Sequence, residues 1–213
     1  MRDTFYIFVR HAESEKNIRD ITGGKGEKLT KEGMEQAVDL SSFLYEQLKD
    51  KELDIISSDT MQTKQTAKII ADMFKGNYQV TEKLEPAGMG VISGLTKREM
   101  EEKYPDLYEQ MVLWREQKIE AIQLEIPEME MPTVFWNRIV NFLREINDGK
   151  IKILVCTRSI MVLVYNLVKG NRPILGHGYK HVKIENCDTI AFSVDANFEN
   201  IQLICEMTSE GLQ

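Results

Sequence analysis

Cysteine is scarce in this sequence, and its three copies lie far apart. Cys156, Cys187 and Cys205 form no Cys-x-x-Cys pair, so their spacing predicts neither a zinc site nor a disulfide framework. The sequence also lacks the His-Glu-x-x-His motif that binds zinc in metal-dependent hydrolases. We therefore expect a protein that uses no metal and no cofactor.

Long apolar runs are missing as well. No stretch of about 18 apolar residues occurs, and a membrane-spanning helix needs at least that many. The apolar run near the N-terminus, Phe5 to Val9, is short and follows Arg2 and Asp3, which is not the pattern of a secretory signal peptide. These features predict a cytoplasmic protein with no membrane partner.

An excess of positive charge is the third absence. The chain has 27 Lys and Arg residues against 34 Asp and Glu residues, a net charge of 27 − 34 = −7. Nucleic acids and anionic membranes select basic surfaces, so neither is an expected partner. The glycine-rich and Walker motifs of nucleotide-binding folds are absent too. This balance still allows one local cationic pocket for a small anion.

What the sequence does contain is an alternation of apolar strands and amphipathic helices. Apolar or alternating runs predict four strands at 5–9, 53–57, 78–84 and 151–156, then an antiparallel pair at 189–194 and 200–207. Helical periodicity is found at 31–48, 59–74, 133–147 and 159–169, with Thr30 as the first N-cap. The first helix is expected to turn inward Met34, Ala37, Val38, Ser41, Leu44 and Leu48.

Strands that alternate with helices predict a mostly parallel sheet covered on both faces. The expected fold class is α/β, a three-layer α/β/α sandwich formed by one domain over residues 1–213. Residues 97–131 are charged, mostly helical and broken at Pro105, and we interpret them as a helical insertion or lid. Glu125, Glu128 and Glu130 near its end would repel anionic substrates if they faced inward, or form a solvated surface if they did not.

Chemically active side chains stand where the predicted strands end. Arg10 and His11 follow the first strand, and Arg158 follows the fourth. Because ligands of open α/β sheets bind beyond the carboxyl ends of the strands, we expect these residues to converge on one crevice. Guanidinium groups match phosphate geometry, and a histidine can act as nucleophile or base. His177 and His181 are expected to be solvent-exposed, although His181 could reach the crevice.

Several segments resemble known motifs in a fixed order. The stretch "FVRHAESEKN" resembles the Arg-His-Gly signature of the histidine phosphatase superfamily, which includes the cofactor-dependent phosphoglycerate mutases. Further segments resemble that family's later motifs in sequence: "LTKEGMEQA", "IISSDTMQTKQTA", "GMGVISGLT" and "ILVCTRS". The resemblance covers nearly all of residues 4–195 and implies a phosphoglycerate mutase-like fold.

The resemblance also implies roles for individual residues. His11 would accept the phosphoryl group of the substrate, and the phosphohistidine would then be hydrolysed. Arg10 would bind the phosphate. The other expected substrate-binding residues are Asn17, Thr22, Gly23 and Gln62.

The chain departs from the family pattern at several of these positions. Gln62 stands where the family has a second pocket arginine, and Arg158 stands where it has a second histidine. The family's acidic residue aligns with Pro86, and Glu85 is one position away. Ala12 replaces a glycine. We expect Glu85 to act as the acid/base and Arg158 to stabilise the transferring phosphoryl group.

Two hypotheses remain open at this stage. The first is a phosphomonoesterase that works through phospho-His11, with weakened activity. The second is an inactive pseudophosphatase that binds a phosphorylated or anionic ligand. A mutase is less favoured, because it must retain a bisphosphate cofactor and keep its phosphohistidine long-lived. The expected partner is a small phosphorylated substrate or phosphate, and the sequence does not specify an oligomeric state.

Overall fold

The computed structural model describes residues 2–24, 26–208 and 211–212, and its frame is a seven-stranded sheet. The strand order is β3–β2–β4–β1–β5–β6–β7. The parallel block consists of β1 (Thr4–Arg10), β2 (Leu53–Ser58), β3 (Gln79–Thr81) and β4 (Ile151–Cys156). The antiparallel edge consists of β5 (Thr189–Val194), β6 (Ile201–Thr208) and β7 (Gly211–Leu212). The predicted α/β sheet is confirmed.

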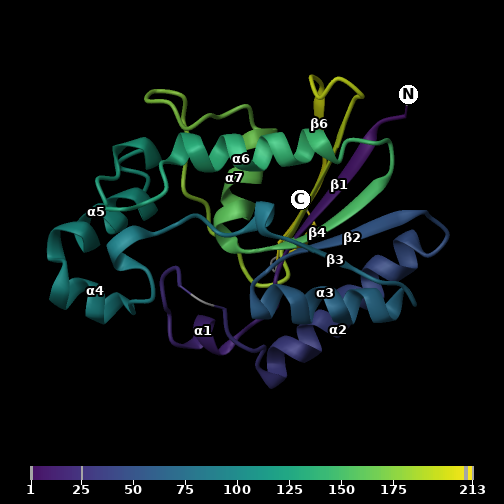
Figure 1. Ribbon diagram of the computed structural model, residues 1–213, viewed down its shortest axis with the longest axis horizontal. Coiled ribbons are helices and arrows are strands. Elements are labelled where there is room, and N and C mark those ends of the chain that lie inside the picture. The colour runs from purple at the N-terminus through teal and green to yellow at the C-terminus, as the bar shows by residue number, and fades with distance from the viewer. Residues whose placement is uncertain (1, 25, 209–210, 213) are drawn as a thin grey trace.

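Helices cover both faces of this sheet (Figure 1). One face carries α2 (Lys31–Leu48) and α3 (Met61–Met73), and the other carries α6 (Pro132–Glu145) and α7 (Arg158–Val168). Successive strand residues point to opposite faces, so Val9 packs with α2 and α3 while Phe8 packs with α6 and α7. This arrangement is the three-layer sandwich that the alternation of elements predicted.

The inward face of α2 differs from the predicted one. Thr30 caps the helix as expected, because its Oγ1 accepts a hydrogen bond from Gly33 N at 2.9 Å. Met34 and Val38, however, are 48% and 46% exposed. The buried stripe runs through Gly33 instead, where an added Cβ would lie 1.9 Å from the carbonyl oxygen of Glu13. This close approach places the smallest residue of the helix against the loop after His11, while Ala37, Ser41 and Leu44 of the predicted face are buried as expected.

The third predicted strand is shorter than expected. It pairs with β2 over Gln79–Thr81, and the chain then enters a single 3-10 turn over Glu82–Leu84. The Thr81 side chain caps this turn by accepting a hydrogen bond from Lys83 N at 3.2 Å. Because β3 is an edge strand, nothing on its outer side extends the pairing.

Residues 97–131 are mostly helical, as predicted. They form α4 (Lys97–Lys103), α5 (Pro105–Arg115) and a 3-10 turn at Ala121–Gln123, with Pro105 as the first residue of α5. A separate small core joins them to the 85–96 loop, and its buried members are Ile92, Met100, Met111 and Ile126. Two of the three acidic residues, Glu125 and Glu128, face solvent.

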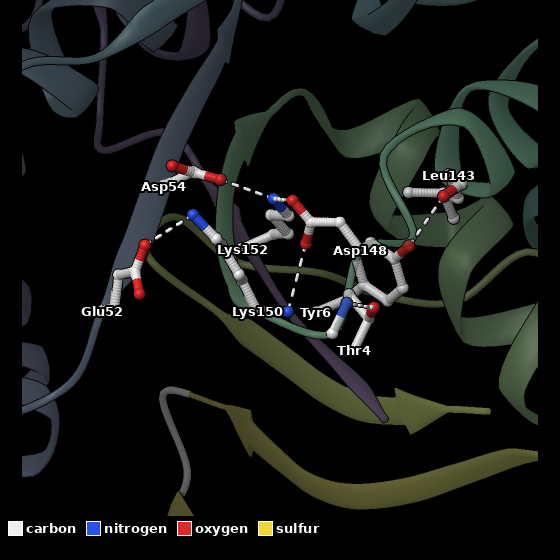
Figure 2. Close-up of polar contacts among 9 residues, drawn as sticks. Thr4, Tyr6, Glu52, Asp54, Leu143, Asp148, Lys150 and Lys152 are labelled. Carbon is white, nitrogen blue, oxygen red and sulfur yellow. Dashed lines mark hydrogen bonds and ion pairs between the residues drawn. The ribbon is translucent and has the colours of Figure 1, made fainter. Parts of the chain in front are cut away.

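A buried lysine, Lys152, lies near the amino ends of the parallel strands (Figure 2). Lys152 is almost completely buried, and its Nζ contacts Asp54 Oδ2 at 2.5 Å and Asp148 Oδ2 at 2.7 Å. Asp54 and Lys152 are register partners in β2 and β4. Nearby, the Tyr6 hydroxyl donates to Leu143 O at 2.7 Å. These contacts join the starts of three strands to α6 and to the turn before β4.

We expect Lys152→Met to lower the free energy of unfolding by ~1–3 kcal/mol. Removing one partner of a fully buried ion pair lowers the free energy of unfolding by about 3–5 kcal/mol, which is more than we expect here. Here the carboxylates left behind are 35% and 47% exposed, so water partly compensates them. Lys150→Met is the matched control, because Lys150 pairs with Glu52 at the surface. Urea unfolding of the two variants checks this, and equal destabilisation would contradict it.

Candidate active site

A cavity lies beyond the carboxyl ends of β1 and β4, and most of the predicted site residues line it. We call it the main cavity. Among its lining residues are Arg10, His11, Asn17, Thr22, Gly23, Gln62 and Arg158. Residues far apart in the sequence meet here because parallel strands end at the same edge of the sheet.

His11 is held as a neutral, buried imidazole. Its backbone N–H donates to Cys156 O at 3.0 Å, which continues the β1–β4 pairing by one residue. Its Nδ1 lies 2.8 Å from Ala12 O. A carbonyl oxygen only accepts hydrogen bonds, so Nδ1 carries the proton and Nε2 carries a lone pair. Burial, and then the nearby Arg10 cation, lower the pKa of His11 to about 3. At neutral pH it is therefore in the nucleophilic form.

Arg10 is a cation enclosed by protein. Its Nη1 donates to Ile184 O at 2.6 Å, while its buried Nε has no hydrogen-bond partner within the described part of the chain. Burial, and then repulsion from Arg158, lower the pKa of Arg10 to about 9, so it remains charged at neutral pH. Two guanidiniums that repel each other across a cavity would both be stabilised by a bound dianion.

Asn17 has its carboxamide oxygen fully engaged. It lies in the short helix α1 (Glu15–Ile18), and its Oδ1 accepts hydrogen bonds from Ser14 N and Ser14 Oγ, both at 3.0 Å. Asn186 Nδ2 also donates to Asn17 Oδ1 at 3.2 Å and to His11 O at 2.8 Å. The amide NH₂ of Asn17 is therefore the group that remains for the cavity.

Gln62 is buried at the start of α3 and joins it to the glycine-rich loop. Its Oε1 accepts a hydrogen bond from Glu27 N at 3.1 Å. Any Cβ at Gly26 would lie 2.2 Å from the same oxygen, so the loop backbone packs directly on this side chain. Gln62 thus lines the cavity with a neutral amide and fixes the loop that carries Thr22 and Gly23.

Arg158 stands at the first residue of α7 and is exposed to solvent. Its neighbour Ser159 ties this end of the helix to the 85–96 loop, because its Oγ accepts a hydrogen bond from Ala87 N at 3.2 Å. The charge of Arg158 reaches across the cavity and helps to lower the pKa of both Arg10 and His181.

Glu85 is the one predicted site residue that the structure does not bring to the cavity. Its Oε1 accepts a hydrogen bond from Asp59 N at 2.9 Å, and burial raises the pKa of its carboxyl. Pro86 lines the cavity in its place. Successive residues of an extended chain point to opposite sides, so the one-position offset turns the carboxylate away.

Three lining cations or histidines were not among the predicted site residues. They are Lys16 in α1, Arg115 at the end of α5, and His181. His181 is half-buried, so it belongs to the cavity and not to the solvent-exposed surface, whereas His177 is exposed. Burial, followed by the charges of Arg115 and Arg158, lowers the pKa of His181 to about 4. Lys16 lies between Arg10 and Asn17 in sequence, so its position alone could have identified it as a residue of the site. Arg115 reaches the site only through the folding of α5.

The cavity is strongly cationic in an acidic protein. Its lining holds Arg10, Lys16, Arg115 and Arg158 against one carboxylate, Asp20. That carboxylate is already paired, with Lys97 Nζ 2.5 Å from Asp20 Oδ2. Among the described residues, no group of three or more His, Cys, Asp or Glu side chains could hold a metal ion. No helix in the same residues is long and apolar enough to cross a membrane.

A family model settles the relationship that these residues suggest. The model of the histidine phosphatase superfamily, branch 1, matches residues 6–204. The chain belongs to the histidine phosphatase superfamily. The match includes every predicted site residue of the cavity, and it agrees with the phosphoglycerate mutase-like fold. No curated protein matches the sequence.

Solved structures of phosphatases and of a phosphoglycerate mutase share the fold. A mycobacterial glucosyl-3-phosphoglycerate phosphatase matches with a TM-score of 0.75 and 19% identity, over 94% of this chain and 96% of its own. A putative alpha-ribazole-5'-P phosphatase from Escherichia coli matches at 0.77 and 17%, over 99% and 98%. A phosphoglycerate mutase from Bacillus anthracis matches at 0.75 and 16%, over 95% and 93%. At these identities the likeness shows the fold alone.

Proposed function

We propose that this protein is a phosphomonoesterase that works through a phosphohistidine on His11. The observation that carries the proposal is the buried, neutral imidazole whose Nε2 is unprotonated beside a cavity lined by four cations. A phosphate dianion would be drawn into such a cavity and held by the Arg10 and Arg158 guanidiniums. Among the structurally similar proteins are two whose names describe phosphatases of small phosphorylated molecules.

The proposed reaction has two displacements at phosphorus. Nε2 of His11 attacks, so that an N–P bond forms while the P–O ester bond breaks and its electron pair leaves on the ester oxygen. Water then attacks the phosphohistidine, the N–P electron pair returns to Nε2, and phosphate departs. Arg10, Arg158 and the Asn17 amide stabilise the equatorial oxygens in both steps.

We also propose that the chain is a single domain in which residues 97–131 act as a lid. Met111, Trp114 and Arg115 of α5 line the main cavity, which supports a roof made by this segment.

The missing general acid should limit the rate of the proposed reaction. Glu85 could reach the ester oxygen only by giving up its hydrogen bond from Asp59 N, so we assign it no proton transfer.

A second candidate function is phosphate binding without turnover, and one observation favours it. Pro86 occupies the cavity wall where the family resemblance places an acid, and general acid–base help is typically worth about 10²–10⁴-fold. Such a pseudophosphatase would bind inorganic phosphate and be stabilised by it against heat.

Trapping the phosphohistidine tests the proposed function. The protein is mixed with para-nitrophenyl phosphate, denatured in base, and digested. Base is used instead of acid because a phosphoramidate bond is acid-labile. We expect nitrophenolate release together with a phosphoryl adduct on the peptide that contains His11. Absence of both, with phosphate still raising the melting temperature, would favour the binding protein. An adduct on another residue would overturn the phospho-His11 mechanism.

The pH profile gives an independent prediction. In the free enzyme His11 has its pKa near 3, so it stays unprotonated between pH 8 and pH 5. Because kcat/KM reports ionisations of the free enzyme and free substrate, its acid limb should follow the second ionisation of the phosphate ester. Two aryl phosphates with different second pKa values should give limbs that shift accordingly. A limb fixed between pH 6 and 7 for both would show an ordinary histidine pKa.

A further inference from the structure

A second, smaller cavity opens beside the main one. We call it the side cavity; it lies between the 85–96 loop, the lid and the start of α6, and its own wall includes Ala121, Leu124, Met129, Phe135 and Tyr179. The two cavities share five lining residues, namely Ala87, Met89, Trp114, Ser159 and Val162. The two cavities are therefore adjacent, with these five residues at their boundary.

The side cavity is apolar and rich in rings. Trp114, Phe135 and Tyr179 bring three aromatic side chains to it, and Ala121 and Leu124 leave space between them. Rings of this kind attract flat apolar groups through stacking and edge contacts. Trp114 Nε1 is buried and has no hydrogen-bond partner within the described residues. This N–H is a donor for which the described residues supply no acceptor.

Two other polar side chains in the same wall, Glu130 and Ser159, already make hydrogen bonds within the protein. Both carboxylate oxygens of Glu130 contact Arg138, at 3.0 and 2.8 Å. The Ser159 hydroxyl oxygen accepts the hydrogen bond from Ala87 N. A sugar or polyol carries several hydroxyl groups and would find few new partners in the side cavity for the water it loses, which is costly. An apolar group would gain by leaving water.

The missing acid points to the same kind of group. With Pro86 in the wall, the carboxylates that line the two cavities are both paired, Asp20 with Lys97 and Glu130 with Arg138. Without a carboxylic acid here, leaving groups that are stable as anions are favoured, because they can take their proton from solvent afterwards. A phenol, with a pKa near 10 like that of tyrosine, does this far more readily than an alcohol, whose pKa is closer to that of water at about 16.

We propose that the substrates are aryl phosphomonoesters, with the phosphate in the main cavity and the aromatic ring in the side cavity. This inference rests on the proposed function. Nε2 of His11 takes the phosphoryl group, the P–O(aryl) bond breaks, and the phenolate leaves with the electron pair. Water regenerates His11 and releases phosphate. The ring is held by apolar walls and its oxygen needs no acid.

Matched esters and a filled cavity test the proposal. We expect kcat/KM to be highest for naphthyl and phenyl phosphates and to rise steeply across substituted phenyl phosphates as the phenol becomes more acidic. Benzyl phosphate keeps the ring but leaves as an alkoxide, so it should inhibit competitively and turn over slowly. Glycerol phosphate should be poor in both respects. A peptide that carries phosphotyrosine distinguishes a macromolecular aryl ester from a small one.

Ala121→Leu and Leu124→Trp should fill the side cavity, since neither residue lines the main one. We expect kcat/KM for naphthyl phosphate to fall ~10–100-fold, while inhibition by inorganic phosphate stays unchanged. Leu175→Phe, at an exposed residue that lines neither cavity, is the control. Melting temperatures identify a variant that fails to fold, and the other variant then decides.

Hydrolysis that depends on His11 but favours glycerol phosphate, or that ignores the phenol pKa, would overturn this inference and leave the proposed function intact. If no ester is hydrolysed and no adduct forms on His11, the proposed function itself fails. In that case the aryl phosphate proposal fails with it.

Discussion

His11→Ala should abolish turnover of an aryl phosphate, with a loss of ~10³-fold or more. Removing the nucleophile removes the covalent route, and what remains is only the electrostatic stabilisation by the cationic wall. Phosphate affinity should survive, because Arg10, Arg158 and Lys16 are untouched. Steady-state kinetics and inhibition by inorganic phosphate measure the two effects separately. His177→Ala is the matched control, since His177 is exposed and lines neither cavity.

The same variant should change how stability responds to acid. The folded-state pKa of His11 is depressed to about 3, below its unfolded value of about 6.5. The folded protein therefore binds fewer protons than the unfolded chain, and His11 destabilises the fold as pH falls from 6.5 toward 3. His11→Ala should lose less unfolding free energy than the wild type between pH 7 and pH 5. An identical pH dependence would contradict the buried, neutral imidazole.

Gly33→Ala should lower the free energy of unfolding by ~3 kcal/mol or more. In an ordinary helix interior this substitution stabilises by about 1 kcal/mol, because alanine is the better helix former. Here the added Cβ would meet three backbone atoms of Glu13, the nearest at 1.9 Å. Backbone cannot move aside as a flexible side chain can, so either α2 or the loop after His11 must shift.

Gly33→Ala should also lower the rate of phosphate ester hydrolysis. Glu13 also accepts hydrogen bonds from Thr30, at its backbone oxygen (3.1 Å) and its carboxylate (2.7 Å). Displacing Glu13 therefore moves the segment that positions His11, and a shift of about 1 Å can cost ~10²-fold in rate. Gly76→Ala is the control, because the nearest atom to its Cβ lies 4.0 Å away. Equal stability of the two variants in urea would refute the steric argument.

Local patterns predicted the frame of this molecule well. The apolar runs of β1, β2 and β4 define a parallel sheet because each is bounded by clear turn or cap residues. The start of α2 could be predicted because Thr30 is a clear N-cap residue. The Arg10–His11 pair and Arg158 could be placed in one site because strand ends of a parallel sheet converge.

The errors share a physical cause, which is packing between distant segments. Periodicity alone put Met34 and Val38 in the core, but α2 packs through Gly33 on Glu13 and leaves both side chains exposed. Glu85 looked available in sequence, but its hydrogen bond from Asp59 holds it outside the cavity. Arg115 carries no local signal, because it enters the site only when α5 packs on the 85–96 loop.

The small core around Met100 and Met111 has a consequence for motion. Its buried members differ from those of the two clusters that hold the sheet, and it joins α4 and α5 to the 85–96 loop, while Trp114 packs on both this core and the larger one. Such a cluster opens as its own cooperative unit, at a lower free energy than global unfolding. We therefore expect α4 and α5 to open locally while the strands that carry Arg10 and His11 stay intact. Amide hydrogens of α4 and α5 should exchange earlier than those of β1 and β4. Under the proposed function, substrate entry and product exit proceed through this local opening of the fold.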